Sequence, residues 1–224
     1  MTDPESAGPS AASTQDPSRV PPIDDWHRLL DGRVAVVTGG GAGIGGAISR
    51  LFGEHGALVE VVDSDPDRST LVVEDIEAAG VVARAHMVDV RSDAEVEDLR
   101  SEVLGEHGRI DVLVNNVGDH RPLVRFHDSN PESWSAMYAA NLEHLFRVTR
   151  AFLQPMIDGG GGSIVNVHSV EGMRGFPGEP VYAAMKAGAA HFTSSLAAGY
   201  GRRGIRVNGS GPDRKSTGLN SRHW

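Results

Sequence analysis

The residues Val34-Ala35-Val36-Val37-Thr38-Gly39-Gly40-Gly41-Ala42-Gly43-Ile44-Gly45 form a short apolar run that gives way to glycines and then to helix-forming residues. This order predicts a strand, a phosphate-binding turn and a helix. Glycine suits such a turn because it adopts positive φ, lets a pyrophosphate approach closely and allows tight packing of helix on strand. The exposed N–H groups and the positive helix end favour a dianion. Since the chain has 28 glycines, a flexible loop is the alternative interpretation.

Apolar runs and helical patterns alternate along the rest of the chain. We expect six strands, at residues 34–37, 58–62, 81–88, 111–114, 163–167 and 205–207. Further helices are predicted at 66–79, 94–107, 131–156 and 181–202, and the helix after the glycines is expected to bury Ile44, Ile48, Leu51 and Phe52. Strands separated regularly by helices imply right-handed crossovers and a parallel sheet covered on both faces. The predicted fold is therefore α/β, a doubly wound parallel sheet of the Rossmann type.

Polar residues stand where these predicted strands end. In a doubly wound sheet, ligands bind beyond the carboxyl ends of the strands. The glycine turn and four further residues fall there, namely Asp63, Asp89, Asn115 and Ser169. Because five strand ends converge on one crevice, we favour a dinucleotide site over a flexible loop.

The overall composition limits the class of protein. At 224 residues the chain fits one domain of ordinary size. Its hydrophobic content of 39% and charged content of 23% are globular values. A net charge of −9 without a long basic block argues against nucleic acid as a partner. With no cysteine, and ten histidines that show no metal-ligand spacing, we expect no metal site.

The two ends of the chain differ from its middle. Residues 1–22 are rich in Ser, Pro, Ala, Asp and Gly, so we expect a disordered tail that cannot offset its ordering entropy by burial. Ile23, Trp26, Leu29 and Leu30 have helical spacing and predict a short turn over the first strand. Residues 23–212 form the predicted dinucleotide-binding catalytic domain, and 213–224 an irregular tail. No apolar run approaches the ~20 residues of a membrane span and no signal peptide is recognisable, so a cytoplasmic protein without a membrane partner is expected.

Asp63 indicates which dinucleotide binds. It closes the second predicted strand, where a Rossmann unit places the acid that accepts hydrogen bonds from the adenosine ribose. A carboxylate there favours NAD, because it would repel the 2′-phosphate of NADP. The neighbouring Ser64, Asp65, Gly40 and Gly41 supply no Arg or Lys to neutralise that phosphate. The alternative interpretation is a solvated acid at a strand end.

Tyr182 and Lys186 are four residues apart on a predicted helix, so both project from the same face. A phenol with a pKa near ~10 is a poor acid-base group at neutral pH, and a neighbouring ammonium lowers that pKa. The same spacing occurs in amphipathic surface pairs. Ser169, at the end of the fifth predicted strand, favours the catalytic interpretation because its hydroxyl would reach the same crevice.

In combination these motifs resemble the short-chain dehydrogenase/reductase family, in its compact single-domain subfamily, over about residues 33–212. The resemblance places the family's T-G-x-x-x-G-x-G and N-N-A-G motifs on this chain at Thr38, Gly39, Gly43 and Gly45, and at Asn115-Asn116-Val117-Gly118. It assigns the family's adenine-contacting Asp to Asp89, its helical Asn to Asn141, its Ser to Ser169, and Y-x-x-x-K to Tyr182 and Lys186.

The resemblance also implies a role for each site residue. Ser169 and Tyr182 hydrogen-bond the substrate oxygen, and Tyr182 gives or takes its proton during hydride transfer at the nicotinamide. Lys186 binds the nicotinamide ribose, and Asn141 holds a water in the proton relay. The expected contacts of the cofactor NAD are Thr38, Gly39, Gly41, Ala42, Gly43, Ile44, Gly45, Asp63, Asp89, Val90, Asn115, Tyr182, Lys186 and Thr217.

The chain departs from the family pattern towards its C-terminus. Val117 replaces the usual Ala, and the family's P-G-x-x-x-T becomes Pro212-Asp213-Arg214-Lys215-Ser216-Thr217, which keeps Thr217 but loses the Gly. Residues 218–224 are polar, whereas family members continue through a substrate-covering segment and a seventh strand. We therefore expect six strands with the seventh missing, as in a truncated or frame-shifted chain, with an exposed sheet edge and no lid over the pocket.

Two classes of function remain open. The leading hypothesis is an NAD-dependent oxidoreductase that interconverts a secondary alcohol and a ketone, which the intact Ser169, Tyr182 and Lys186 favour. The alternative is a truncated, weakly active or inactive homologue that only binds a dinucleotide or a partner subunit. An epimerase or dehydratase of the extended subfamily is disfavoured by the glycine spacing. Six loop residues border the substrate pocket or are ordinary surface residues: His120, Arg121, Arg125, Met173, Arg174 and Phe176.

The helix after Tyr182 bears on assembly. It carries small residues that permit close packing against another helix: Ala183, Ala184, Ala187, Gly188, Ala189 and Ala190. Family members commonly pair this helix, and the one bearing Asn141, across a two-fold axis, so a homodimer or homotetramer is expected. A helix packed within its own subunit is the alternative.

Overall fold

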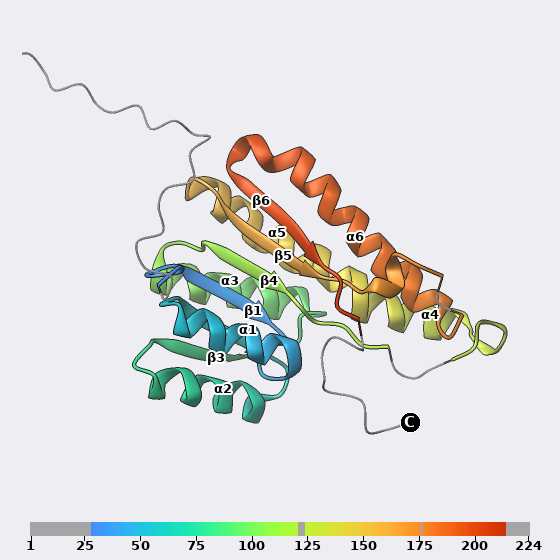
Figure 1. The fold of residues 1–224 in the computed structure, drawn as a ribbon, viewed down its shortest axis with the longest axis horizontal. Coiled ribbons are helices and arrows are strands. Elements are labelled where there is room, and N and C mark those ends of the chain that lie inside the picture. Colours follow the sequence, from blue (N-terminus) through green and yellow to red (C-terminus); the bar gives the residue numbers. More distant parts are fainter. Residues whose placement is uncertain (1–27, 121–123, 176, 214–224) are drawn as a thin grey trace, which may run out of the picture.

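The structure, a computed structural model, describes residues 28–120, 124–175 and 177–213. Six parallel strands form one sheet in the order β3-β2-β1-β4-β5-β6 (Figure 1). The chain leaves β1 first toward β2 and β3, and then returns to the other side of β1 to form β4, β5 and β6. The predicted doubly wound α/β fold is confirmed. The strands are β1 (Val34–Thr38), β2 (Leu58–Asp63), β3 (Ala83–Met87), β4 (Val112–Asn115), β5 (Gly162–Val167) and β6 (Ile205–Ser210).

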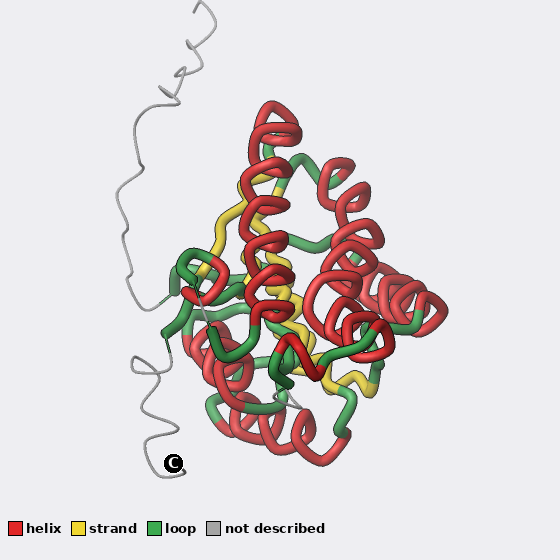
Figure 2. Tube along the Cα trace, turned by 90° about the vertical axis from the view of Figure 1, so that its right-hand side faces the viewer, coloured by secondary structure: helices red, strands yellow, loops and turns green. Residues whose placement is uncertain are grey.

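Helices cover both faces of this sheet (Figure 2). On one face, side chains of α1 and α2 pack with Ala35, Val37, Val59 and Val61. On the other face, α3, α5 and α6 pack over a second cluster of core residues centred on Phe152. The helices are α1 (Gly43–Glu54), α2 (Pro66–Ala78), α3 (Asp93–His107), α4 (Pro131–Tyr138), α5 (His144–Asp158) and α6 (Pro180–Tyr200).

Local sequence signals fix where the helices begin and end. Asp65 caps α2 by accepting hydrogen bonds from the backbone N–H groups of Asp67 and Arg68, at 3.1 and 3.3 Å. Ser92 caps α3 in the same way through Glu95. Gly108 ends α3 with a φ of 66°, a left-handed conformation that glycine adopts without strain. Asp65 and Ser92 thus fix where α2 and α3 begin, and Gly108 fixes where α3 ends.

Two expectations about the helices were wrong in detail. Leu51, expected in the core, is 49% exposed, because α1 approaches the sheet through its small residues Gly45, Gly46, Ser49 and Gly53. A Cβ on Gly53 would lie 2.7 Å from Ile76, so α1 and α2 pack too closely there for a larger residue. The single helix expected over 131–156 is instead α4 and α5 joined by a π-helical turn (Ala139–Glu143).

Several expectations fall outside the described residues. They are the disordered tail at 1–22, the positions of Ile23 and Trp26, and the C-terminal segment from residue 214. Of the predicted turn, Leu30 packs against the apolar cluster that underlies α1 and α2. Within the described residues, no helix is both long and apolar enough to cross a membrane.

Candidate active site

The glycine turn between β1 and α1 has room for a ligand on one side only. Gly39 and Gly43 have φ values of 61° and 55°, which glycine tolerates best. A Cβ on Gly45 would lie 2.0 Å from the Gly39 carbonyl oxygen, so the inner side of the turn is filled by backbone. A Cβ on Gly43 would meet nothing within 4 Å. The outer side of this turn, at the start of α1, therefore fits the pyrophosphate of a dinucleotide.

Asn116, directly after β4, holds this turn in place through hydrogen bonds. Its side-chain nitrogen donates to the carbonyl oxygens of Thr38 and Gly39, each at 3.2 Å. Its backbone N–H donates to the Thr38 hydroxyl at 3.1 Å, and that hydroxyl donates to the Val114 carbonyl. Thr38 is fully buried, so its side chain fixes the turn from within the sheet. The motif Asn115-Asn116-Val117-Gly118 does not by itself assign this role to Asn116, and the signal for it is an amide directly after the strand beside the turn.

A pocket of about 400 Å³ lies beside the turn, at the carboxyl ends of the strands. Asp63 is in its wall, and the Asp63 carboxylate accepts hydrogen bonds from the backbone N–H groups of Gly41 and Asp65, both at 3.1 Å. Of the predicted cofactor contacts, the pocket is lined by Gly39, Ala42, Asp63, Asp89 and Val90. The wall also includes Asn116, Val117, Gly118 and Asp119, which lead towards β4 and the π-helical turn.

Two arginines that are not among the predicted site residues line the pocket, Arg68 and Arg91. Arg68 lies in the first turn of α2, where its Nε is 3.0 Å from the Asp65 carboxylate. Arg91 holds the Asp89 carboxylate with both its Nε and a terminal nitrogen, at 2.9 and 2.7 Å, and this contact lowers the pKa of Asp89. Each arginine is therefore paired with an acid, Arg91 with Asp89 of the pocket wall and Arg68 with Asp65, the N-cap of α2.

Asn115 lies apart from the pocket wall. Its side chain is 2% exposed, and its nitrogen donates to the side-chain oxygens of Asn166 at 2.9 Å and Thr149 at 3.2 Å. Asn166 in turn donates to the Thr193 hydroxyl at 2.9 Å. This buried chain of polar groups connects β4, β5, α5 and α6. Any contact between Asn115 and a cofactor therefore has to use its main chain.

Ser169, Tyr182 and Lys186 come together as their spacing predicts. Ser169 follows β5 and caps the short 3-10 turn Val170–Gly172, and its side chain is near enough to the Tyr182 hydroxyl to lower the pKa of Tyr182. Lys186 lies one turn beyond Tyr182 on α6, with its Nζ 5.7 Å from the centre of the phenol ring. Lys186 is 3% exposed and donates to the Val167 carbonyl at 3.4 Å.

The electrostatics of this group differ from the expectation. Burial raises the pKa of Tyr182, and the negative charges of Glu179, Glu171 and Asp119 raise it further, while Ser169 lowers it. The net pKa of Tyr182 is therefore raised, and the lowering expected from Lys186 is not found. Burial also lowers the pKa of Lys186 to about 8. At neutral pH the pair is therefore a phenol beside an ammonium.

Asn141 lies in the π-helical turn and contacts the pocket wall. Its side-chain nitrogen donates to the Asp119 carbonyl at 2.6 Å, and its oxygen accepts from the Asp119 N–H at 3.2 Å. Gly118 lies between Asn141 and Lys186, since a Cβ there would be 2.6 Å from the Lys186 Nζ. Asn141, Gly118 and Lys186 thus form one contiguous wall, which leads from the pocket to Tyr182.

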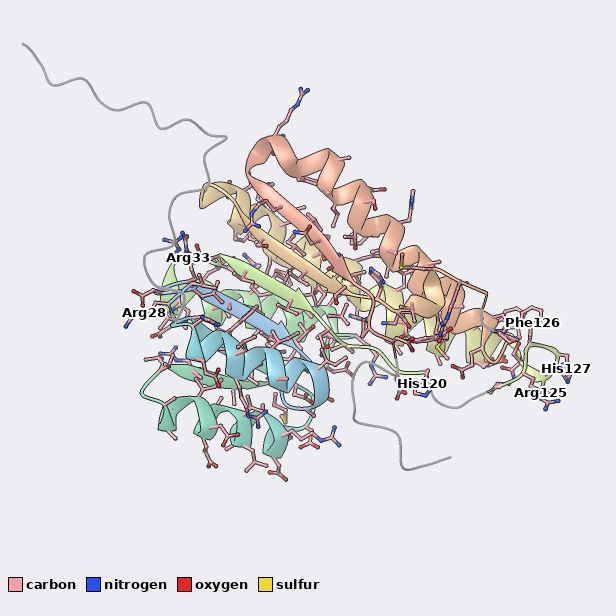
Figure 3. All side chains as sticks on the ribbon, in the orientation of Figure 1. Arg28, Arg33, His120, Arg125, Phe126 and His127 are labelled. Carbon is pink, nitrogen blue, oxygen red and sulfur yellow. The ribbon has the colours of Figure 1, made fainter. Side chains whose placement is uncertain are left out.

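The six loop residues considered for the border of the substrate pocket lie in different places. The His120 ring packs edge-on against Tyr182, with centres 6.1 Å apart. Figure 3 places Arg125, with its neighbours Phe126 and His127, at the end of a protruding segment away from His120. Met173 is exposed, and Arg174 is paired with Glu171 at 2.8 Å. Arg121, Phe176 and Thr217 lie outside the described residues.

Within the described ranges, no group of three or more His, Cys, Asp or Glu side chains is arranged to hold a metal ion. The groups gathered here are instead the glycine turn, the carboxylate of Asp63 and the set Ser169, Tyr182 and Lys186. Together they suit a dinucleotide and an alcohol or carbonyl group.

Comparison with known proteins agrees with this geometry. The family profile described as short chain dehydrogenase matches residues 33–223. The 3-oxoacyl-(acyl-carrier-protein) reductase FabG of Chlamydia muridarum is 38% identical over 183 residues, which cover 81% of this chain and 73% of that protein. The chain also resembles the solved structure of a 7 alpha-hydroxysteroid dehydrogenase complexed with NADH and 7-oxo glycochenodeoxycholic acid, with a TM-score of 0.79 and 33% identity, over 83% of this chain and 72% of the other.

A second solved structure carries the other nicotinamide cofactor. A metagenomic short-chain oxidoreductase in complex with NADP matches with a TM-score of 0.78 and 35% identity, over 82% of this chain and 83% of the other. The chain therefore belongs to the short-chain dehydrogenase family, whose members are oxidoreductases that bind a nicotinamide dinucleotide.

Proposed function

We propose that this protein transfers a hydride between NAD(H) and a secondary alcohol or ketone, with Tyr182 as the acid-base residue. The observation that carries the proposal is that Ser169, Tyr182 and Lys186 lie together beside Gly118, which lines the dinucleotide pocket. A secondary alcohol needs one group to move its hydroxyl proton and another to hold its oxygen. Tyr182 and Ser169 supply these two groups, and Ser169 is close enough to Tyr182 to lower the pKa of its hydroxyl.

Each residue has one task in this scheme. The nicotinamide supplies the carbon that accepts or donates the hydride. Tyr182 donates its proton to the substrate oxygen in ketone reduction and accepts it in alcohol oxidation. Ser169 fixes that oxygen, Lys186 binds the nicotinamide ribose, and Asn141 holds the relay water that exchanges protons with solvent. The burial of Lys186 and Asn141, at 3% and 1% exposure, keeps these groups in fixed positions.

NAD is proposed as the cofactor because of the charges around Asp63. The Asp63 carboxylate is held in the pocket wall by the Gly41 and Asp65 N–H groups, so it cannot easily turn away from an adenosine ribose. Arg68 and Arg91 are the cations of this wall, and each is paired with its own carboxylate. A ribose 2′-phosphate would thus meet Asp63 before it met an uncompensated positive charge.

Cofactor choice is tested by titrating the protein with NADH and NADPH and following nicotinamide fluorescence. We expect NADH to bind at least about tenfold more tightly, which corresponds to ~1.4 kcal/mol. Asp63→Ala combined with Ser64→Arg should narrow or reverse this gap. Asp67→Asn is the matched control, because Asp67 is an exposed acid of the same segment that does not line the pocket. Equal affinities in the unchanged protein would contradict the NAD assignment.

Turnover is tested with a panel of secondary alcohols and NAD, measured as absorbance at 340 nm. Oxidation of at least one alcohol is expected. Tight NADH binding without turnover of any alcohol or ketone would point instead to an inactive homologue that only binds a dinucleotide.

We also propose that the protein acts as a homodimer or homotetramer and takes a small-molecule substrate.

A further inference from the structure

Glu60, within β2, is a buried acid that lies between two histidines. Its side chain is 3% exposed. One carboxylate oxygen is hydrogen-bonded to Nε2 of His86 on β3, and the other to Nε2 of His107, the last residue of α3, at 2.5 Å. None of these three residues lines the dinucleotide pocket, so the proposed hydride transfer does not account for them.

His86 contacts a carboxylate through each of its two ring nitrogens. Its Nε2 meets Glu60, and its Nδ1 lies 3.1 Å from Oε2 of Glu102 on α3. An ionised carboxylate only accepts hydrogen bonds, whereas a neutral imidazole has a single N–H to donate. Two hydrogen bonds to two carboxylates therefore require a proton on both nitrogens. The contacts of His86 are those of an imidazolium.

Groups of both charges surround His86. The titratable side chains that face it are Glu60 from β2, Arg84 from β3, and Glu102, Glu106 and His107 from α3. Arg84 is paired with Glu106, so His86 is the cation that contacts both Glu60 and Glu102. The helix α2 packs on the apolar cluster of the opposite face. Glu60, His86 and Glu102 also border one hollow of the surface, through which a proton can reach or leave the imidazole.

These contacts tie α3 to the edge of the sheet. β3 is an outer strand, next to β2 in the sheet order. Within the described residues, the side-chain hydrogen bonds from β3 to α3 come from Arg84 and His86. The arginine keeps its charge at all ordinary pH values, whereas a histidine loses its charge near neutral pH. The His86 contacts are therefore the ones that respond to pH.

The pKa values of Glu60 and His86 are shifted in opposite directions. Burial lowers the pKa of His86, but its contacts with Glu60 and Glu102 outweigh burial, and the pKa is raised above its ordinary value of 6.5. Burial raises the pKa of Glu60, but the two histidines outweigh it, and the pKa is lowered below 4.5. The stabilising effect of His86 is thus complete below pH 6.5 and is lost as the pH rises through the raised pKa. The effect of Glu60 is complete above pH 4.5 and is lost as the pH falls through the lowered pKa.

We propose that Glu60, His86 and Glu102 form a proton-dependent clamp, which holds α3 on the edge of the sheet while His86 is an imidazolium. When Nδ1 releases its proton to solvent, one N–H remains on the ring. Because Glu60 is buried and Glu102 is 66% exposed, the remaining N–H stays with Glu60, and the contact with Glu102 on α3 opens. Alkaline pH therefore loosens this edge of the fold.

The first test reads the protonation of His86 directly, by ¹⁵N NMR of the imidazole nitrogens of the full chain between pH 5 and pH 10. The signals are assigned by their loss in His86→Gln. We expect both nitrogens to carry a proton at pH 7 and the transition to lie above pH 6.5. A transition at or below pH 6.5 would overturn the clamp.

The second test compares the unfolding equilibrium constants of His86→Gln and the unchanged protein in urea. Glutamine keeps an N–H donor but no charge. A charge-assisted hydrogen bond is about twice as strong as a neutral one, so the constant should rise by about 5- to 10-fold at pH 6 and by less than about twofold at pH 9.5. Glu106→Gln is the matched control: it breaks an ion pair between the same two elements whose cation keeps its charge, so its effect should be equal at both pH values. An equal effect of His86→Gln at both pH values would contradict the proposal.

Glu102→Gln serves if His86→Gln fails to fold. The glutamine amide can donate to a neutral Nδ1, so the second proton on His86 is no longer needed. The NMR transition of His86 should then move to lower pH. A transition that stays in place would refute the part of Glu102 in the clamp.

Discussion

Tyr182 and Lys186 show how burial changes the chemistry of a short motif. The spacing of the two residues predicts that an ammonium lowers the pKa of the phenol. In the structure, burial acts on both groups and favours their neutral forms, and three nearby acids favour the protonated phenol. Tyr182 is therefore ready to donate a proton to a ketone at neutral pH. Alcohol oxidation needs the phenolate and should be favoured by alkaline conditions.

The pKa of Lys186 leads to a prediction about pH. Burial lowers this pKa to about 8, so the ammonium is present below pH 8 and is lost as the pH rises through that value. We expect NADH affinity to fall by about tenfold or more between pH 7 and pH 9.5, because a charge-assisted contact to the cofactor is lost. Fluorescence titrations across this range measure it. Lys186→Met should bind NADH weakly at every pH, and an equally steep decline in that variant would refute the assignment.

The residues that could not be predicted are those whose place depends on how the elements pack. Arg68 follows Asp63 by five residues, and it lines the pocket because the first turn of α2 lies beside it. Glu179 looks like an ordinary loop acid in the sequence. Its burial becomes visible only when α6 packs beside the crevice. The motif residues, by contrast, were identified because their spacing alone places them on one strand end or one helix face.

At the scale of the elements, the glycine turn leaves no room for a side chain at Gly45. Gly45→Ala would place a Cβ 2.0 Å from the Gly39 carbonyl and 2.5 Å from the Asn116 side chain, so the turn has to move. We expect a loss of roughly 1–3 kcal/mol in unfolding free energy, together with weaker NADH binding. Urea unfolding and NADH titration measure the two effects.

Gly105→Ala in α3 is the control for this change. A Cβ there meets nothing within 4 Å, so the substitution should raise stability by about 0.5–1 kcal/mol through helix propensity. NADH binding should remain unchanged. If Gly45→Ala were as harmless as Gly105→Ala, the close packing of α1 on the turn would not be a requirement for the site.

The elements themselves were largely predictable from the sequence. All six strands and their parallel arrangement follow from apolar runs separated by helical patterns. The π-helical turn at Ala139–Glu143 was not predicted, because the apolar period continues across it. The reason for the interruption lies in tertiary contacts: Asn141 exchanges two hydrogen bonds with the main chain of Asp119, 22 residues earlier. No local pattern reports such a contact.

At the scale of the whole molecule, the sheet order determines the site. Because β1 lies between β2 and β4, the glycine turn has Asp63 on one side and Asn116 on the other. Ser169, after β5, then lies next along the same edge, where α6 brings Tyr182 and Lys186. The sites for dinucleotide and substrate are therefore adjacent because their strands are adjacent, although the residues span much of the chain.

Assembly is a prediction for the whole molecule. One side of α6 is exposed and carries mainly small residues, namely Ala184, Ser194, Ser195, Ala198 and Gly199. Gly188, in contrast, packs on Leu142 of the same chain, so part of the small-residue pattern serves the subunit itself. We expect light scattering at micromolar concentration to give at least twice the chain mass of 23.7 kDa. Ala198→Arg should lower this mass, whereas Leu71→Arg on the exposed side of α2 should not. A monomer mass for the unchanged protein would refute the dimer.

Tyr182→Phe tests the central claim most directly. The change keeps the aromatic ring and its packing against His120 but removes the only proton that the ring can transfer. The measurement is the pair of values obtained on one preparation: the dissociation constant of NADH, and kcat for a secondary alcohol that the unchanged protein oxidises with NAD. We predict that NADH affinity stays within about threefold while kcat falls by about 10²–10⁴-fold. A variant that keeps both its NADH affinity and its kcat would contradict the assignment of Tyr182 as the acid-base residue.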